Sequence, residues 1–235
     1  MIRIFKRIKE SLLNENRFKS YMMYAIGEIV LIVIGILIAV QINNWNESKK
    51  SDAKIKSVLL LIKDNLKEDK AELELNLEIG KKKFLNYWQT VLEKNPADGD
   101  YSNLINHLGV YDFNSNNSGY LSAIRGDILS LIDNRELVNN ITAYYELKFR
   151  EMENRSAEFA RWTLLMTNLI FDSFARNEKI KGIRKRTQIV ISDPVFKETL
   201  LELLSTTKDL LKKISDRIIS ADSLIAKIEM ELSIK

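Results

Sequence analysis

The longest run of hydrophobic residues lies near the start of the chain, from Tyr21 to Val40. These 20 residues carry one charge, Glu28, and the stretch Ile29–Val40 contains only Ile, Val, Leu, Gly and Ala. An α-helix rises 1.5 Å per residue, so about 20 residues cross a hydrocarbon core of roughly 30 Å. The pattern therefore predicts a transmembrane helix over residues 21–42, in preference to the buried helix of a water-soluble protein.

The residues that flank this run support the same interpretation. Tyr21 and Tyr24 lie at one end and Trp45 beyond the other, as in the aromatic belts of membrane proteins. A cleaved signal peptide is the alternative. The run is long for such a peptide, however, and Ala39 lies among large residues rather than in a small-x-small cleavage site. We expect an uncleaved signal anchor.

Beyond the anchor, apolar residues recur at spacings of three, four and seven, which predicts long amphipathic helices. Three such stretches are evident, at about 51–94, 135–174 and 193–233. Gly80 marks a possible kink in the first stretch, and Asp193-Pro194 is a good start for the third, because Asp caps helices and Pro suits the first helical position.

The segments between the long helices are expected to be shorter or irregular. We predict a short helix over 102–109 and a helix of about four turns from 118, with Leu121, Ile124, Ile128 and Leu131 facing inward. The stretch 175–192 is basic and is expected to be irregular. Scarce glycine, at 8 residues, and proline, at 2, also favour helix over strand.

These patterns together predict an all-α protein with three parts. Residues 1–20 form an amphipathic basic arm, residues 21–42 the transmembrane helix, and residues 43–235 an elongated bundle of three long helices plus shorter ones. The arm could lie on an anionic inner leaflet or could be merely solvated.

The distribution of charge along the chain predicts an orientation in the membrane. Residues 1–20 hold two acidic residues and six basic ones, namely Arg3, Lys6, Arg7, Lys9, Arg17 and Lys19. The other 215 residues balance at 30 basic and 30 acidic, so the whole net charge of +4 lies beside the apolar run. A nucleic-acid-binding domain would carry its excess on the folded part. The asymmetry instead predicts a cytoplasmic N-terminus and a bundle outside the cytoplasm, in the periplasm of a Gram-negative cell.

Within the predicted span, Glu28, Ile32, Gly35 and Ala39 recur at helical spacing and form one seam. The pair Gly35-x-x-x-Ala39 is a small-x-x-x-small packing motif, and a carboxylate near the middle of a membrane usually faces a partner or an ion path. The seam predicts a helix–helix interface. Two alternatives remain: a tolerated acid that is neutral or snorkels to the interface, and an acid coupled to ion movement.

Few residues are candidates for metal binding or catalysis. No cysteine is present, which excludes disulfides and thiolate metal sites, and His107 is the only histidine. The run Lys67-Glu68-Asp69-Lys70 is typical of a solvated helix face, and Arg184-Lys185-Arg186 of a polar loop. Tyr144 and Tyr145 are better explained by core packing than by a ligand cleft. We expect no catalytic, metal or cofactor site.

One family resemblance rests on particular residues. The segment that begins Tyr24-Ala-Ile-Gly-Glu28 and ends Gln41-Ile-Asn-Asn-Trp-Asn-Glu47 resembles the N-terminus of a Bacteroidetes family of small membrane proteins, the domain of unknown function 6090. Ser118-Gly119, Asn134 through Leu137, and Tyr144-Tyr145 resemble a second, weaker pattern of that family. The resemblance implies a bacterial envelope location and a helical extracytoplasmic domain, and it implies no activity.

The first hypothesis for function is a membrane-anchored interaction or scaffold protein that binds the bilayer and associates with itself or with another membrane protein. The alternatives are an accessory subunit of an ion-coupled membrane complex that uses Glu28, and a ligand-sensing periplasmic domain whose small molecule is unknown. An enzyme is the least supported class, and no nucleic-acid partner is expected.

Overall fold

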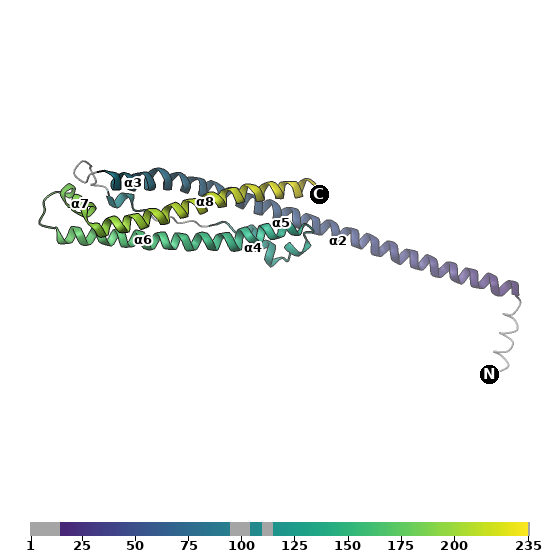
Figure 1. The fold of residues 1–235 in the computed structure, drawn as a ribbon. Coiled ribbons are helices and arrows are strands. Elements are labelled where there is room, and N and C mark those ends of the chain that lie inside the picture. Colours follow the sequence, from purple (N-terminus) through teal and green to yellow (C-terminus); the bar gives the residue numbers. More distant parts are fainter. Residues whose placement is uncertain (1–14, 95–103, 110–114, 235) are drawn as a thin grey trace, which may run out of the picture. The chain divides into compact units, whose positions relative to one another are not determined.

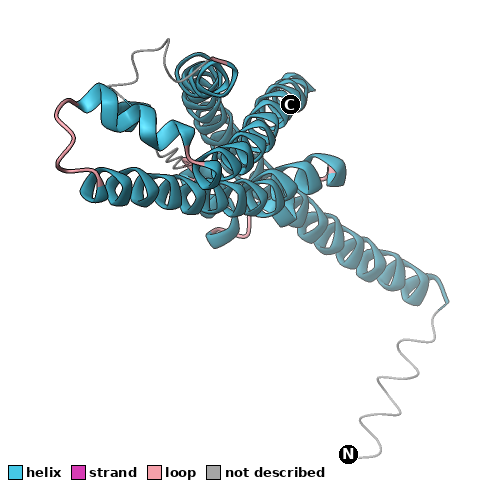
Figure 2. Ribbon diagram, turned by 60° about the vertical axis from the view of Figure 1, so that its left-hand side comes forward, coloured by secondary structure: helices cyan, strands magenta, loops and turns pink. Residues whose placement is uncertain are grey.

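The computed structural model describes residues 15–94, 104–109 and 115–234, and in these ranges the protein is all-helical, as predicted (Figures 1 and 2). The arm residues Arg3, Lys6, Arg7 and Lys9 lie outside the described residues. The elements are α2 (Glu15–Ile79), the π-helical η1 (Gly80–Leu85), α3 (Asn86–Glu93), the 3₁₀ turn η2 (Leu104–His107), α4 (Ser118–Arg125), the 3₁₀ turn η3 (Leu129–Leu131), α5 (Arg135–Thr142), the π-helical η4 (Ala143–Lys148), α6 (Phe149–Arg176), α7 (Ile183–Ser192) and α8 (Pro194–Ile234).

The chain divides into two units, Met1–Ala53 and Lys54–Lys235, and α2 contributes to both. In the first unit, every residue from Lys19 to Lys50 is exposed. Among the described residues this unit contains one helix that is long and apolar enough to cross a membrane, and none of its apolar window is buried by the rest of the chain. Within the described residues, the apolar part of this helix is therefore not packed as a core helix.

The second unit packs around two apolar clusters. One joins the C-terminal part of α2 and α3 to α6, α7 and the first half of α8, with Trp88, Phe159 and Phe196 fully or nearly fully buried. The other joins α2 from Ile55 onward to α4, α5 and the second half of α8, which includes Ile228. The three predicted amphipathic stripes thus bury one another, which is the usual solution for apolar helix faces.

The bounds of the third long helix agree with the sequence. Asp193 precedes α8 and its Oδ1 atom accepts a hydrogen bond from the Val195 backbone N–H at 2.8 Å, which caps the first turn. At Gly80 the helix does not end; a π-helical stretch of six residues begins there and leads directly into α3.

The segment 118–131 is shorter and turns earlier than predicted. α4 ends at Arg125, and Asp127 adopts a left-handed conformation with φ of 50°. The backbone N–H groups of Asp127 and Ile128 donate to the carbonyls of Ile124 and Ala123, at 3.0 and 2.8 Å, which is the hydrogen-bond pattern of a Schellman motif. This turn leaves Ile124 and Leu131 exposed and Leu121 half-buried, so of the four residues predicted to face inward only Ile128 is buried.

The prediction of an irregular stretch over 175–192 is wrong for its second half. α7 covers Ile183–Ser192 and buries Thr187, Val190 and Ile191. Val190 and Ile191 belong to the larger apolar cluster, while Arg184 and Lys185 of the same helix are exposed.

Candidate functional site

The predicted seam of the apolar helix is open along its length. Glu28, Ile32, Gly35 and Ala39 all lie on α2 and all are exposed. A Cβ atom added at Gly35 would meet nothing within 4 Å. Among the described residues, therefore, no part of this chain packs against the glycine of the seam.

The predicted interfacial residues are also exposed. Tyr21, Tyr24 and Trp45 have exposed fractions of 77%, 81% and 61%. The Lys49 ammonium lies 4.4 Å from the centre of the Trp45 ring, a cation–π contact that holds the amphipathic indole next to a basic side chain. Of the arm, Lys19 is exposed on α2, and Arg17 belongs to the same helix.

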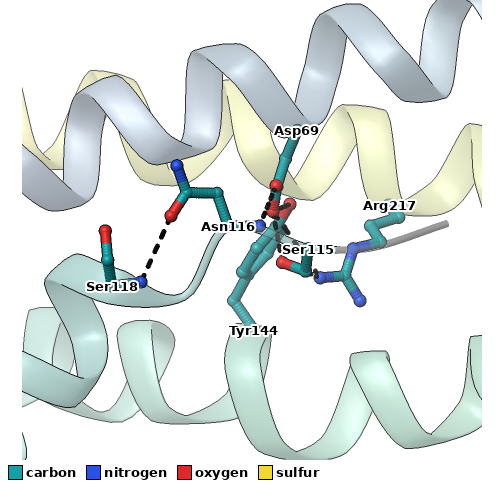
Figure 3. A network of polar contacts seen from close by, with 6 residues as sticks. All are labelled: Asp69, Ser115, Asn116, Ser118, Tyr144 and Arg217. Atoms are coloured by element: carbon teal, nitrogen blue, oxygen red, sulfur yellow. Dashed lines mark hydrogen bonds and ion pairs between the residues drawn. The ribbon is translucent and has the colours of Figure 1, made fainter.

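In the bundle, the structure brings together a buried polar cluster that the sequence did not predict (Figure 3). Asn65 and Asp69 lie one turn apart on α2 and are only 3% and 2% exposed. The charged pattern around Asp69 suggested a solvated face, and for Lys67 and Glu68 this is so, but Asp69 points inward. Buried polar groups need hydrogen-bond partners, and both residues find them in the segment that leads into α4.

Asn65 holds the start of α4. Its Oδ1 atom accepts hydrogen bonds from the Gly119 backbone N–H at 2.8 Å and from the Ser118 hydroxyl at 3.1 Å. The Gly119 N–H is one of the first donors of a helix, which have no acceptor within the helix itself. A Cβ at Gly119 would lie 2.8 Å from the Ile62 backbone nitrogen, so only glycine allows α4 to approach α2 this closely.

Asp69 binds Ser115 and Asn116, which lie three and two residues before α4. Its Oδ1 atom accepts from the Asn116 backbone N–H at 2.8 Å, and its Oδ2 atom accepts from the Ser115 hydroxyl at 2.5 Å. The neighbouring Glu68 accepts from the Asn116 side-chain amide at 2.7 Å. Two carboxylates on one turn of α2 thus fix the segment Ser115–Asn116 along the bundle.

Arg217 of α8 completes the cluster from the opposite side. Its side chain is 2% exposed, and its Nη2 atom lies 3.9 Å from Asp69 Oδ2 and donates to the Ser115 hydroxyl at 3.3 Å. The guanidinium also lies 4.4 Å from the centre of the Tyr144 ring, while the Tyr144 hydroxyl lies 3.4 Å from Asp69 Oδ2. We refer to Asp69, Ser115, Asn116, Tyr144 and Arg217 as the polar clamp.

Burial dominates the protonation behaviour of the clamp. Removal from water raises the pKa of the Asp69 carboxyl, although its hydrogen bonds and Arg217 act in the opposite direction. Burial also raises the pKa of Tyr144 to about 12, so this tyrosine is a neutral donor at physiological pH. The hydrogen bonds of the clamp hold Ser115, which precedes α4, between Asp69 of α2 and Arg217 of α8.

A second aromatic and polar layer adjoins the clamp. The rings of Tyr120 and Tyr145 stack with centroids 4.8 Å apart, and the Tyr120 hydroxyl donates to Glu146 at 2.6 Å. The π-helical turns of η4 place both Tyr144 and Tyr145 in the core although they are adjacent in sequence. Both tyrosines are thus buried in the core, as predicted for this pair.

Asn134 ties the next helix to α8. Its Oδ1 atom caps α5 by accepting from the Leu137 N–H at 3.1 Å, and its amide donates to the buried Glu231 at 3.0 Å. Each part of the weaker sequence pattern therefore contacts a second element of the bundle. This holds for Ser118-Gly119, Asn134 and Tyr144-Tyr145.

The remaining candidate sites are His107, metal-binding groups and a small surface hollow. The His107 ring stacks on Tyr87 at 3.6 Å, and its carbonyl accepts from the Trp88 indole at 3.0 Å, which is a packing role. In the described part of the chain no group of three or more His, Cys, Asp or Glu residues could hold a metal ion. A shallow hollow of about 280 Å³ lies between Asn140 and Tyr144 on one side and α8 on the other, where Lys227 lines it.

Comparison with known proteins yields one family. No curated protein and no solved structure matches the chain significantly. The Family of unknown function (DUF6090) matches residues 28–157, which is more than half of the chain. The matched region begins at Glu28 and contains Asn65, Asp69 and the segment 115–119, whereas Arg217 lies beyond it. On this evidence the chain belongs to the Family of unknown function (DUF6090).

Proposed function

We propose that this protein is a membrane-anchored, self-associating interaction protein of the bacterial envelope, without catalytic activity. In this proposal α2 crosses the inner membrane of a Bacteroidetes cell once, the N-terminus is cytoplasmic, and residues 43–235 form the periplasmic bundle. The observation that carries the proposal is that every residue of the apolar stretch Ile29–Val40 is exposed.

An exposed surface of this kind is unstable in water. Soluble monomers rarely expose contiguous apolar patches larger than a few hundred Å². Ile29, Leu31 and Leu37 are each at least 60% exposed, and they lie on different sides of the helix. Lipid covers a helix from every side, whereas a single protein partner covers one face, so a bilayer is the environment that fits the whole stretch.

Self-association is supported by the seam. A carboxylate near the centre of a bilayer costs about 3 kcal/mol on insertion scales, which favours burial of Glu28 against another helix. Gly35 and Ala39 allow two helix backbones to approach closely there. A second copy of the same seam would shield both carboxyl groups from lipid and is the simplest partner.

The bundle supports a scaffold rather than an enzyme. Its two most buried charged side chains among the described residues, Asp69 and Arg217, hold a loop segment and three helices together. A group committed to such contacts is not available to a substrate. In this proposal the bundle presents a fixed outer surface to partners while α2 provides attachment.

The test is the stoichiometry of the full-length chain in neutral nanodiscs or mild detergent, measured by native mass spectrometry. Wild type should form a dimer or a higher oligomer, and Gly35→Ile should weaken it at least tenfold, because close helix packing requires a small residue. Gly27→Ile is the matched control: it also adds a side chain where nothing lies within 4 Å, but roughly 80° away from Gly35 around the helix. A strictly monomeric wild type would contradict self-association.

An accessory subunit of an ion-coupled complex is the second candidate, and the position of Glu28 within the predicted span of residues 21–42 favours it. Glu28→Gln separates the two. If the residue only mediates packing, the amide should retain association and cellular function, because it can still hydrogen-bond across an interface. Loss of cellular function with intact association would support ion coupling instead.

A further inference from the structure

Positive charge in the second unit is gathered at one corner, where α6, α7 and α8 meet (Figure 1). Residues 175–186 contain six basic residues and one acidic residue, Glu178. The remainder of residues 54–235 holds 22 basic and 26 acidic residues, so it is net negative. We refer to the exposed basic residues of this segment as the basic corner, namely Arg176, Lys179, Lys181, Arg184 and Lys185.

The basic corner does not take part in the ion pairs of the fold. None of its five side chains belongs to a salt bridge within the described residues, although lysines elsewhere in the bundle do, such as Lys70 with Asp222 at 2.7 Å. Arg186 differs from them, since it is half-buried and lies over the Phe174 ring at 5.4 Å. The five exposed residues therefore do not stabilise the fold through salt bridges within the described residues.

Their position also opposes helix stability. Arg184, Lys185 and Arg186 occupy the first turns of α7, which has no acidic residue in its first turn and no side-chain cap. The N-terminal end of a helix carries a partial positive charge, so cations there are unfavourable. The presence of this charge at the start of α7 is better explained by an external anion than by the stability of the helix.

Exposed apolar residues accompany the charge. Ile183 and Ile189 on α7 are 47% and 39% exposed. Ile189 lies one turn after Lys185, and both line a broad, shallow hollow together with Ile180, Asp193 and Pro194. A helix that shows lysine and isoleucine to the same side is suited to the interface of a bilayer, where apolar groups enter the acyl boundary and cations meet phosphates.

The corner lies at the end of its unit that is remote from residue 54. Ile55 packs in the cluster that contains Ile228, near the C-terminal end of α8, whereas Val190 and Ile191 of α7 pack with Phe196, near its start. Pro194 and Ile228 are about 50 Å apart along α8 at 1.5 Å per residue. Within this unit, the basic corner is thus well separated from the point where the chain continues toward the apolar helix.

We propose that the basic corner is a docking surface for an anionic lipid bilayer. The partner is defined by its chemistry: a phosphate-bearing surface that offers many negative charges and an apolar boundary at once. A flat, mixed basic and apolar surface fits such a partner better than it fits a single phosphate or a shaped protein groove. The inference is independent of the seam in α2 and of self-association.

The test uses the full-length chain in nanodiscs of phosphatidylcholine, mixed with vesicles that contain phosphatidylglycerol, with binding measured by co-sedimentation. The corner variant carries Lys179→Gln, Lys181→Gln and Lys185→Gln. At the usual strength of attraction between basic residues and an anionic leaflet, these three changes should weaken binding about a hundredfold. Binding of wild type should also weaken with salt, and vesicles of phosphatidylcholine alone should bind poorly.

Matched variants keep the test specific. Lys81→Gln, Lys208→Gln and Lys212→Gln remove the same charge from exposed lysines elsewhere and should leave binding near wild type. Lys6→Gln, Lys9→Gln and Lys19→Gln reveal any contribution of the arm, and Lys→Arg at the three corner positions should restore binding. Equal binding by the corner and control variants would overturn the proposal, as would absence of wild-type binding to the anionic vesicles, even if the protein then bound an acidic polypeptide.

Discussion

Gly119→Ala tests the close contact between α4 and α2. The new methyl group would lie 2.8 Å from the Ile62 backbone nitrogen and 2.9 Å from Asn65 Oδ1, distances that real Cβ atoms essentially never show. The backbone atom cannot move aside as a flexible side-chain end could. α4 must therefore shift outward, which lengthens or breaks the buried bond between Asn65 and the Gly119 N–H.

The expected loss follows from three contributions. Overpacking costs about 1–3 kcal/mol, and an unsatisfied buried polar group about 1–3 kcal/mol. Alanine regains up to about 1 kcal/mol of helix propensity. The net loss of unfolding free energy should be about 1–5 kcal/mol, which at about 3 °C per kcal/mol for a chain of this size lowers Tm by roughly 3–15 °C.

The assay is thermal and denaturant unfolding of the full chain in mild detergent, followed by far-UV and near-UV circular dichroism. Gly109→Ala is the control, because its Cβ would meet nothing within 4 Å and a surface change usually stays within about 0.5 kcal/mol. If Gly119→Ala were as stable as Gly109→Ala, the packing of α4 on α2 described above would be refuted.

Three further predictions concern the polar groups of the bundle. Arg217→Met should lower the free energy of denaturant unfolding by about 3–5 kcal/mol, because it leaves the buried Asp69 without its cation. Adding Asp69→Asn to this variant should recover part of that loss. Burial raises the pKa of Asp69 above 3.8, so the folded state binds the carboxyl proton more tightly than the unfolded state does. The free energy of unfolding of wild type, relative to that of Asp69→Asn, should therefore fall as pH rises from about 3.8 through the raised pKa. A relative free energy of unfolding that rises with pH would mean that Arg217 outweighs burial. Asn134→Ala should cost about 1–2 kcal/mol, since it removes the cap of α5 together with the partner of Glu231, and unchanged unfolding would contradict that double role.

The long helices could be predicted because their stripes are wide and regular. Asp193-Pro194 is a strong local start signal, and its cap forms as expected. α7 escaped prediction because its buried stripe is only Thr187, Val190 and Ile191, set among basic residues that dominate the local composition. The early end of α4 depends on the left-handed conformation of Asp127, which an apolar pattern does not encode.

The polar clamp could not be predicted for a different reason. Asp69 lies in a run of charged residues whose other members are solvated or half-buried, and nothing local separates it from them. Its burial depends on Ser115 and Arg217, which are 46 and 148 positions away along the chain. One indirect signal existed: Ser118-Gly119 is a small pair next to the apolar stripe of α4, as close helix contacts require.

If the seam of α2 joins two copies of this protein within a membrane, cysteines placed along the helix should crosslink with a helical period. The chain has no cysteine, so single cysteines can be placed at each position from Glu28 to Ile42 without removing any. After oxidation in native membranes, we expect disulfide-linked dimers that peak at positions 28, 32, 35 and 39 of the seam and are weak between them. A profile without this helical period, or one without crosslinked dimers, would contradict association through the seam.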